Sequence, residues 1–298
     1  NLASKIVKHY APVAEKRSHD FITYKRLEKH IKEKYLGKKS DFRTFLEDLM
    51  QAKGIAYANQ MVLFYSAAED SADMAARFSS SILGVPLLCS RCHDHKIHPD
   101  IKVDDFWSLA AFFEGMNKKI VSDKAGLAEI EKQFENKYKT RSEIGKEEYK
   151  QVMQWIETEK AGKSVYSSLT AEETLGQNMS NTLKDKPRRR NNDEEDTSLK
   201  APQLFIYESN KALSSLKIDY ELDGKKYTSR ASHFKRDRRI NDKDLPRDIL
   251  SKWMARREPL YLARAVTNWT TNWLYGRGWV MPAYDTYNTS GPQGEALN

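Results

Sequence analysis

The chain has 298 residues, of which 39% are hydrophobic and 31% are charged, and its formal net charge is +8. The length is enough for one large domain or two ordinary ones, and the composition is too apolar for a disordered chain. No apolar run approaches the 18 residues of a membrane span, and most of the positive charges are interleaved with Asp and Glu, so we expect neither a transmembrane segment nor specific nucleic-acid binding.

The first part of the sequence has mostly helical patterning. Residues 1–50 are basic, with apolar side chains at helical spacing, and Gly54 breaks this pattern before residues 56–64, which read as a strand or a buried loop. Residues 70–84 suit a helix with Asp70 or Ser71 as its cap. Residues 106–113 predict a further helix, which is apolar on most faces and therefore mostly buried.

The later part mixes helices with a short β region. Residues 125–160 predict a helical hairpin or a protruding arm. Residues 161–200 are polar, and the charge block at 186–196 reads as a mobile surface loop or as a docking site for an acidic partner. A strand is expected at 203–207, a hairpin at 216–227 around Asp223-Gly224, and two helices from 246 and about 260 onwards.

The expected fold is mainly α, with a small β-hairpin insertion. We expect residues 1–117 to form a helical domain that contains both cysteines of the chain. Residues 118–200 then form a charged helical arm and a polar linker, and residues 201–298 a small β-hairpin with a helical C-terminal domain.

The two cysteines of the chain both lie in one short motif, Cys89-Ser90-Arg91-Cys92-His93. Cys-x-x-Cys-His is the attachment signature of c-type haem. Two thiols at this spacing can each form a thioether to one vinyl group of the same porphyrin, and the next residue, His93, is then placed as the proximal iron ligand. Apolar segments before and after the motif, at 82–88 and 106–113, would suit the walls of a haem pocket.

Other readings of the motif stay open. His95 and His98 lie close by, so Cys89 and Cys92 with one or two of the three histidines could form a structural zinc site. A redox-active dithiol is a further alternative, although no βαβ pattern surrounds the motif. For a haem, Met116 and His98 are candidates for the sixth iron ligand, and His95 for tuning the site by hydrogen bonding.

Two stretches of the sequence resemble the planctomycete-type cytochrome C family, with its PSCyt2-like domain followed by a PSD1-like domain. The first runs from Ile82 through Cys-x-x-Cys-His-Asp-His-Lys and on to Phe106-Trp107-Ser108-Leu109-Ala110-Ala111-Phe112-Phe113. The second comprises Leu262-Ala263-Arg264-Ala265-Val266-Thr267-Asn268-Trp269 and Tyr275-Gly276-Arg277-Gly278. The resemblance covers residues 54–117 and 245–285 and implies a mostly helical, exported bacterial protein.

Arg264, Asn268 and the Gly276-Arg277-Gly278 turn admit two interpretations. They could serve helix termination and packing, since residues four apart lie on one helix face. Alternatively, Arg264 or Arg277 could pair with the haem propionates.

The sequence therefore predicts a periplasmic or extracellular protein with one covalent haem c, which passes single electrons to a redox or assembly partner protein. The N-terminus looks processed, as after removal of a signal peptide. The alternatives are an interaction subunit in which haem or zinc staples the fold, and a haem enzyme with an open iron. No catalytic residue is assigned.

Overall fold

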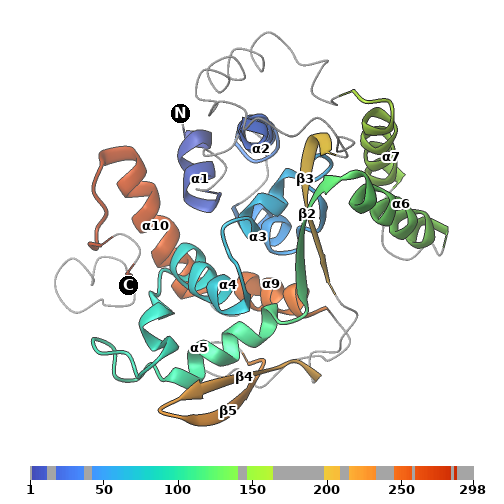
Figure 1. Cartoon of the computed structure of the whole chain (residues 1–298). Helices are drawn as coiled ribbons and strands as arrows, with labels where there is room; N and C mark the ends of the chain where they lie inside the picture. Colours follow the sequence, from blue (N-terminus) through green and yellow to red (C-terminus); the bar gives the residue numbers. More distant parts are fainter. Residues whose placement is uncertain are drawn as a thin grey trace, which may run out of the picture.

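A computed structural model of the protein describes residues 2–11, 18–36, 42–139, 146–163, 198–208, 215–232, 245–256, 259–282 and 285–286. The architecture is mainly helical, with one three-stranded sheet and one hairpin (Figure 1). The helices are α1 (Leu2–Tyr10), α2 (Ser18–Lys34), α3 (Phe42–Met50), α4 (Ser71–Phe78), α5 (Val103–Ala110), α6 (Lys124–Lys139), α7 (Lys146–Lys160), α9 (Pro246–Arg256) and α10 (Pro259–Tyr275). None of these helices combines the length and the hydropathy needed to cross a membrane.

The predicted N-terminal helices are confirmed, and each buries one apolar stripe. In α1 the buried face comprises Ala3, Ile6, Val7 and Tyr10, which recur every three to four residues. The same spacing places Phe45, Leu46 and Leu49 of α3 in the main core. Residues 60–65, expected within a strand or a buried loop, form the 3₁₀ turn η2 (Gln60–Tyr65), which is buried throughout.

Helices α4 and α5 flank the cysteine motif. Asp70 caps α4 as predicted, because its side chain accepts a hydrogen bond from the backbone N–H of Asp73 (2.7 Å). The helix continues into the short π-turn η3 (Ser79–Leu83), and the 3₁₀ turn η4 (Leu87–Arg91) follows. Helix α5 begins at Val103, where Asp105 accepts from the backbone N–H of Lys102 (2.8 Å), and it runs into η5 (Ala111–Phe113).

The three-stranded sheet joins distant parts of the chain. Its order is β1–β3–β2, with β1 (Gly54–Ile55) and β2 (Met116–Asp123) both antiparallel to β3 (Ser198–Glu208). Strand β3 extends the strand predicted at 203–207, whereas β2 carries no strand pattern in its sequence because most of its side chains are exposed. The domain boundaries predicted after residues 117 and 200 fall inside β2 and β3, and the three-domain division stays a prediction.

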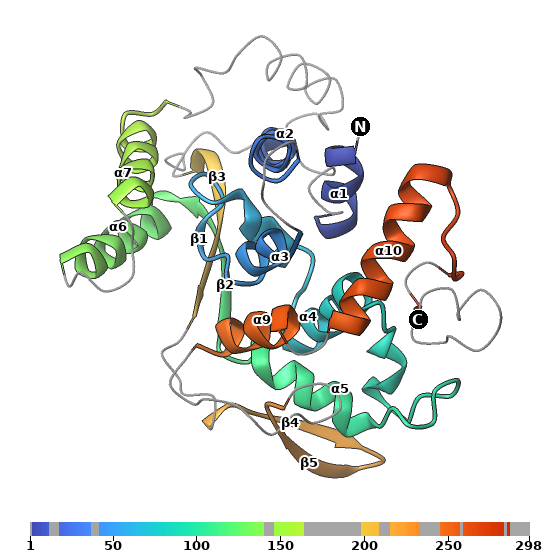
Figure 2. The same cartoon turned by 180° about the vertical axis from the view of Figure 1, so that it is seen from behind.

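The predicted hairpin and arm are both present. Strands β4 (Lys217–Leu222) and β5 (Lys225–Arg230) pair around Asp223 and Gly224, both with positive φ. In both views this hairpin lies along α5, while α6 and α7 stand at the outer edge beyond β2 and β3 (Figures 1 and 2). The two arm helices share a second, smaller core with the sheet, comprising Leu127, Ile130, Phe134, Val152, Trp155, Ile156, Val121 and Phe205. The charge block at 186–196 lies outside the described residues.

A buried ion pair fastens α9 to the sheet. The side chains of Arg247 and Glu208 are 1% and 5% exposed, and Nε of Arg247 lies 3.1 Å from Oε1 of Glu208. The guanidinium also donates to the backbone carbonyls of Ala52 (2.7 Å) and Met50 (3.3 Å), and it lies over the ring of Tyr65. One side chain therefore links α9, the end of α3, β3 and η2.

Replacing Arg247 by Met should lower the free energy of unfolding by about 3–5 kcal/mol, because Glu208 would be left as a buried, unpaired carboxylate. Urea denaturation followed by circular dichroism measures this loss. Lys252→Met, an exposed change on the same helix, is the control and should stay within about 0.5 kcal/mol of the unchanged chain. Equal effects of the two substitutions would contradict the role given to the pair.

Helix α1 packs on α10 through His9. The imidazole contacts the rings of Trp269 and Trp273 at centroid distances of 4.5 and 5.5 Å, and its Nε2 lies 3.0 Å from the backbone oxygen of Ser81. Burial lowers the pKa of His9 to about 4. The folded chain thus holds a neutral imidazole over a pH range in which the unfolded chain binds a proton.

Above pH 6.5, neutral His9 makes its full contribution to the free energy of unfolding. This contribution should be lost progressively as the pH falls from about 6.5 towards 4, because only the unfolded chain then binds a proton readily. Between pH 7 and 4.5, the free energy of unfolding should fall by roughly 2 kcal/mol less in His9→Gln than in the unchanged chain. An unchanged pH dependence in the variant would show that His9 titrates normally.

Candidate functional site

The cysteine motif forms a surface turn between η3 and α5. Cys89 lies within η4, and Cys92 is the residue at which this 3₁₀ turn ends. Residues three apart eclipse one another in a 3₁₀ turn, so the two side chains project from the same side. Both are free thiols and exposed. The spacing and the exposure together suit two attachments to one flat ligand.

Two neighbouring helices hold this turn in place. The guanidinium of Arg91 lies 3.4 Å from Asp73 and 3.8 Å from Asp70, at the start of α4. The indole of Trp107 in α5 donates to the backbone oxygen of Arg91 (3.1 Å). These contacts were not apparent in the sequence, because the residues at each end are far apart along the chain. They fix the backbone between the two cysteines.

His93 presents one ring nitrogen to solvent. The imidazole is exposed, and its Nδ1 lies 2.8 Å from the backbone oxygen of Asp94. A proton on Nδ1 makes this a hydrogen bond and leaves Nε2 as the lone-pair nitrogen, which is the arrangement found in metal-bound histidines. Asp94 is held in turn by Lys102 (2.9 Å) and by the backbone N–H of Val103 (3.2 Å). These hydrogen bonds, with that to Lys102 as the largest cause, lower the pKa of Asp94.

His95 and His98 are buried and lie apart from this exposed group. Nδ1 of His95 accepts hydrogen bonds from the backbone N–H groups of Ile97 (3.2 Å) and His98 (3.1 Å), which closes the loop between the motif and α5. The two imidazole rings are 4.7 Å apart, and Nε2 of His98 lies 3.5 Å from Oδ1 of Asp285. Burial, followed by the neighbouring His98, lowers the pKa of His95. Both residues shape the loop.

The zinc alternative finds no support in this geometry. Among the residues that the structure describes, no group of three or more His, Cys, Asp or Glu side chains lies close enough together to hold a metal ion. The thiols face solvent, whereas His95 and His98 are buried, at 4% and 6% exposure.

The apolar segments expected to wall a haem pocket are mostly core. Exposure is at most 1% for the side chains of Ile82, Leu83, Val85, Leu87, Phe106, Phe112 and Phe113. Leu88 is the exception, at 56%, and it borders a cavity of about 460 Å³ whose lining includes neither cysteine nor His93. The other lining residues are His9, Ala76, Arg77, Ser80, Ser81 and Pro86. This volume is within the usual range for small-molecule sites. With the paired thiols and the free Nε2 of His93, the residues present fit a covalently attached haem.

The candidates for the sixth ligand lie in unfavourable places. Met116 begins β2 and packs against the main core. It follows the C-terminal end of α5 and η5, whereas the motif loop is bonded to the N-terminal end of α5, and a helix of that length spans on the order of 15 Å. That separation argues against Met116. His98, beside His95 and Asp285, would have to leave its buried position.

Asn268 and Gly278, in the C-terminal part of the chain, take part in packing. Asn268 in α10 accepts a hydrogen bond from the backbone N–H of Val280 (2.8 Å) and donates to the carbonyl of the same residue (2.9 Å). A Cβ on Gly278 would lie 2.6 Å from Oδ1 of Asn268, so only glycine fits this turn. Arg277 is exposed and Arg264 is half-buried in α10. Their pairing with propionates stays a prediction.

The residues that lead into the motif are in close contact with the C-terminal part of the chain. Gly84 has φ +66°, and its carbonyl accepts from the backbone N–H (2.8 Å) and the hydroxyl (3.2 Å) of Thr286. A Cβ at this position would collide with Thr286 and lie 2.9 Å from Cβ of Ala265 in α10. The residues that lead into the motif therefore pack directly against α10 and Thr286.

The comparison with protein families matches residues 17–118 to the model described as PSCyt2: Protein of unknown function (DUF1549). Residues 17–118 are a PSCyt2-like domain. It contains the whole cysteine motif, the anchors Arg91 and Trp107, and the loop with His95 and His98. Neither the comparison with curated proteins nor that with solved structures found a match. The PSCyt2-like domain covers about a third of the chain, and Arg264 and Arg277 lie outside it.

Gly84→Ala should destabilise the chain by clearly more than Gly224→Ala. Both positions have positive φ, which costs a residue with a Cβ roughly 1–2 kcal/mol, but a Cβ at Gly224 meets nothing within 4 Å. The collision at Gly84 should add about 1–3 kcal/mol. Unfolding free energies of the two variants measure the difference, and equal losses would show that the turn before the motif is not closely packed.

Proposed function

We propose that this chain is an exported protein that carries one haem c, attached through Cys89 and Cys92 with His93 as axial iron ligand, and that it passes single electrons. The observation that carries the proposal is the geometry of His93. Its Nδ1 is occupied by the backbone oxygen of Asp94, which leaves Nε2 as the lone-pair nitrogen of an exposed ring, and His93 directly follows the second of two exposed thiols in sequence.

The chain's own residues would hold and orient the cofactor. Arg91, tied to α4 and α5, fixes the turn that presents both thiols on one side. The carbonyl of Asp94 selects the tautomer of His93, and Asp94 itself is anchored by Lys102 and Val103 at the start of α5. When bound, the haem supplies a one-electron change in the oxidation state of its iron.

A role as a structural staple is less well supported. The apolar side chains around the motif already form a closed core between α4, α5 and the turns. A haem on this surface would add contacts to a fold that packs without it. An enzyme with an open iron would need an enclosed site that excludes water, and the exposed thiols and His93 do not provide one.

An exposed cofactor suits electron transfer, because a partner protein can approach it closely. Leu88 and Ile97, exposed by 56% and 65%, flank the motif in sequence, and Lys96 and Lys102 are exposed in the same loop region. An apolar patch with basic residues at its margin favours a redox or assembly partner with a complementary acidic rim. The location in the periplasm or outside the cell, and the PSD1-like nature of the C-terminal block, belong to this proposal.

The test is an absorption spectrum in alkaline pyridine, recorded on the reduced chain after production in a host that attaches haem c. We expect a sharp α-band that survives acid–acetone extraction, and a protein mass larger by one haem. Cys89→Ala/Cys92→Ala should show neither and should keep its near-ultraviolet circular dichroism, because the core packs without the cofactor. Lys96→Ala, an exposed change in the same loop, should keep both signals.

No Soret band in the unsubstituted chain would overturn the proposal. A band that persists in the double-cysteine variant would show a haem bound elsewhere. Loss of the fold in that variant would favour the structural role. Voltammetry of the loaded chain on an electrode then tests electron transfer, which requires a reversible one-electron couple.

A further inference from the structure

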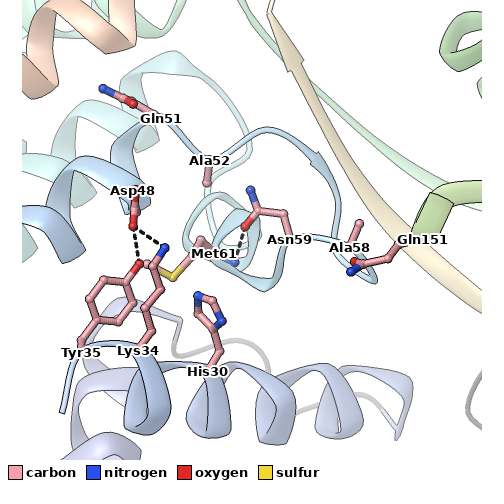
Figure 3. A pocket seen from close by; sticks show the side chains of 10 residues that line it. All are labelled: His30, Lys34, Tyr35, Asp48, Gln51, Ala52, Ala58, Asn59, Met61 and Gln151. Atoms are coloured by element: carbon pink, nitrogen blue, oxygen red, sulfur yellow. Dashed lines mark hydrogen bonds and ion pairs between the residues drawn. The ribbon is translucent and has the colours of Figure 1, made fainter. Parts of the chain in front are cut away.

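A second cavity, away from the cysteine motif, lies between α2, α3 and η2. It has a volume of about 360 Å³, and Figure 3 shows its lining. The side chains come from the C-terminal end of α2, from α3 and the turns that follow it, from η2, and from Gln151 in the arm helix α7. None of these residues takes part in the proposed haem site.

One side of the cavity is a hydrogen-bonded polar group. Oδ2 of Asp48 accepts hydrogen bonds from the phenol of Tyr35 (2.5 Å) and from the ammonium of Lys34 (2.8 Å), both in or just after α2 (Figure 3). The charges of Lys34 and Asp48 offset each other. Oδ1 of Asp48 has no hydrogen-bond partner among the described residues, so it is available as an acceptor.

His30 supplies the second polar group. Its ring rises from α2 towards Met61 in Figure 3, and its centroid lies 5.8 Å from that of Tyr35. Burial, followed by the charge of Lys34, lowers the pKa of His30, so the imidazole is neutral near pH 7 and has one donor and one acceptor nitrogen. Within the described ranges, neither nitrogen is hydrogen-bonded to another residue.

The remaining wall is apolar. The side chains of Met61 and Ala52 are 3% and 2% exposed, and the ring of Tyr35 lies beside them. The amide groups at the rim are already used in part. Asn59 accepts from the backbone N–H of Met61 (3.2 Å), and Gln51 points away from the other side chains and donates to Ser251 (3.3 Å).

These walls define the ligand by its charge and its shape. Lys34 and Asp48 cancel and His30 is neutral, so the cavity offers no net charge to attract an anion or a cation. It offers acceptors and a donor on one side and hydrocarbon on the other. Hydroxyl groups, which donate and accept at once, match the first side, and the C–H face of a saturated ring matches the second.

We propose that this cavity binds a neutral sugar unit, whose hydroxyl groups bond to His30 and Asp48 and whose ring packs on Met61 and Tyr35. The site is independent of the proposed haem, since no residue is shared between them. The chain would then contain a recognition site for saccharides in the same PSCyt2-like domain as the cysteine motif.

Saturation-transfer NMR tests this with glucose, galactose, mannose, xylose and N-acetylglucosamine, each at millimolar concentration, and with glucuronate as the charged counterpart. We expect transfer to the ring C–H protons of at least one neutral sugar and weaker transfer to glucuronate. His30→Ala and Asp48→Asn should each weaken that binding about tenfold, the loss of roughly one hydrogen bond. Lys32→Gln, an exposed change on α2, should leave it unchanged.

The same titration on full-length Cys89→Ala/Cys92→Ala separates this site from the haem, because sugar binding should persist there. The absence of saturation transfer from every neutral sugar would overturn the proposal. Equal binding by all the variants would place the sugar elsewhere, which also overturns it, and stronger binding of glucuronate than of the neutral sugars would make the cavity an anion site.

Discussion

The buried pair of Arg247 and Glu208 is the contact on which most of the tertiary arrangement depends. The guanidinium of Arg247, on α9, donates hydrogen bonds to Glu208 in β3 and to the backbone at the end of α3, and it lies over the ring of Tyr65 in η2, so segments nearly 200 positions apart meet at one side chain. A buried charge is costly unless it is paired, and Glu208 and the backbone carbonyls of Met50 and Ala52 supply the partners here. An arrangement that left Arg247 or Glu208 buried without its partner would be less stable, so the pair favours this packing of α9 on the sheet.

The cysteine motif is an exposed turn that contacts with the neighbouring elements hold in place. Arg91 and Trp107 hold the turn from inside, and the motif loop closes on itself through Nδ1 of His95. The preceding turn at Gly84 leaves no space for a side chain against α10 and Thr286. Reactive groups at the surface are thereby held in a defined geometry, which is the requirement for attaching and orienting a cofactor.

The polar wall of the second cavity forms only when α2 and α3 pack together. His30, Lys34 and Tyr35 read in sequence as ordinary positions on a basic amphipathic helix. Asp48 on α3 makes them part of a neutral, hydrogen-bonding wall, because its carboxylate offsets the charge of Lys34 and accepts a hydrogen bond from the phenol of Tyr35. The cysteine motif and all the lining residues of this cavity except Gln151 lie within residues 17–118.

The sequence by itself determined the helical character of the chain, the hairpin at Asp223-Gly224 and the cysteine motif, because each rests on local periodicity, turn chemistry or spacing. It did not reveal strand β2, whose polar residues become a strand only by pairing with β3. It assigned different roles to His93, His95 and His98 from their places in the motif, but it did not show which of the three are buried. Only the tertiary structure decided that His93 is exposed while His95 and His98 are buried, because burial depends on Asp285, Ile101 and α5, which the chain brings there by folding.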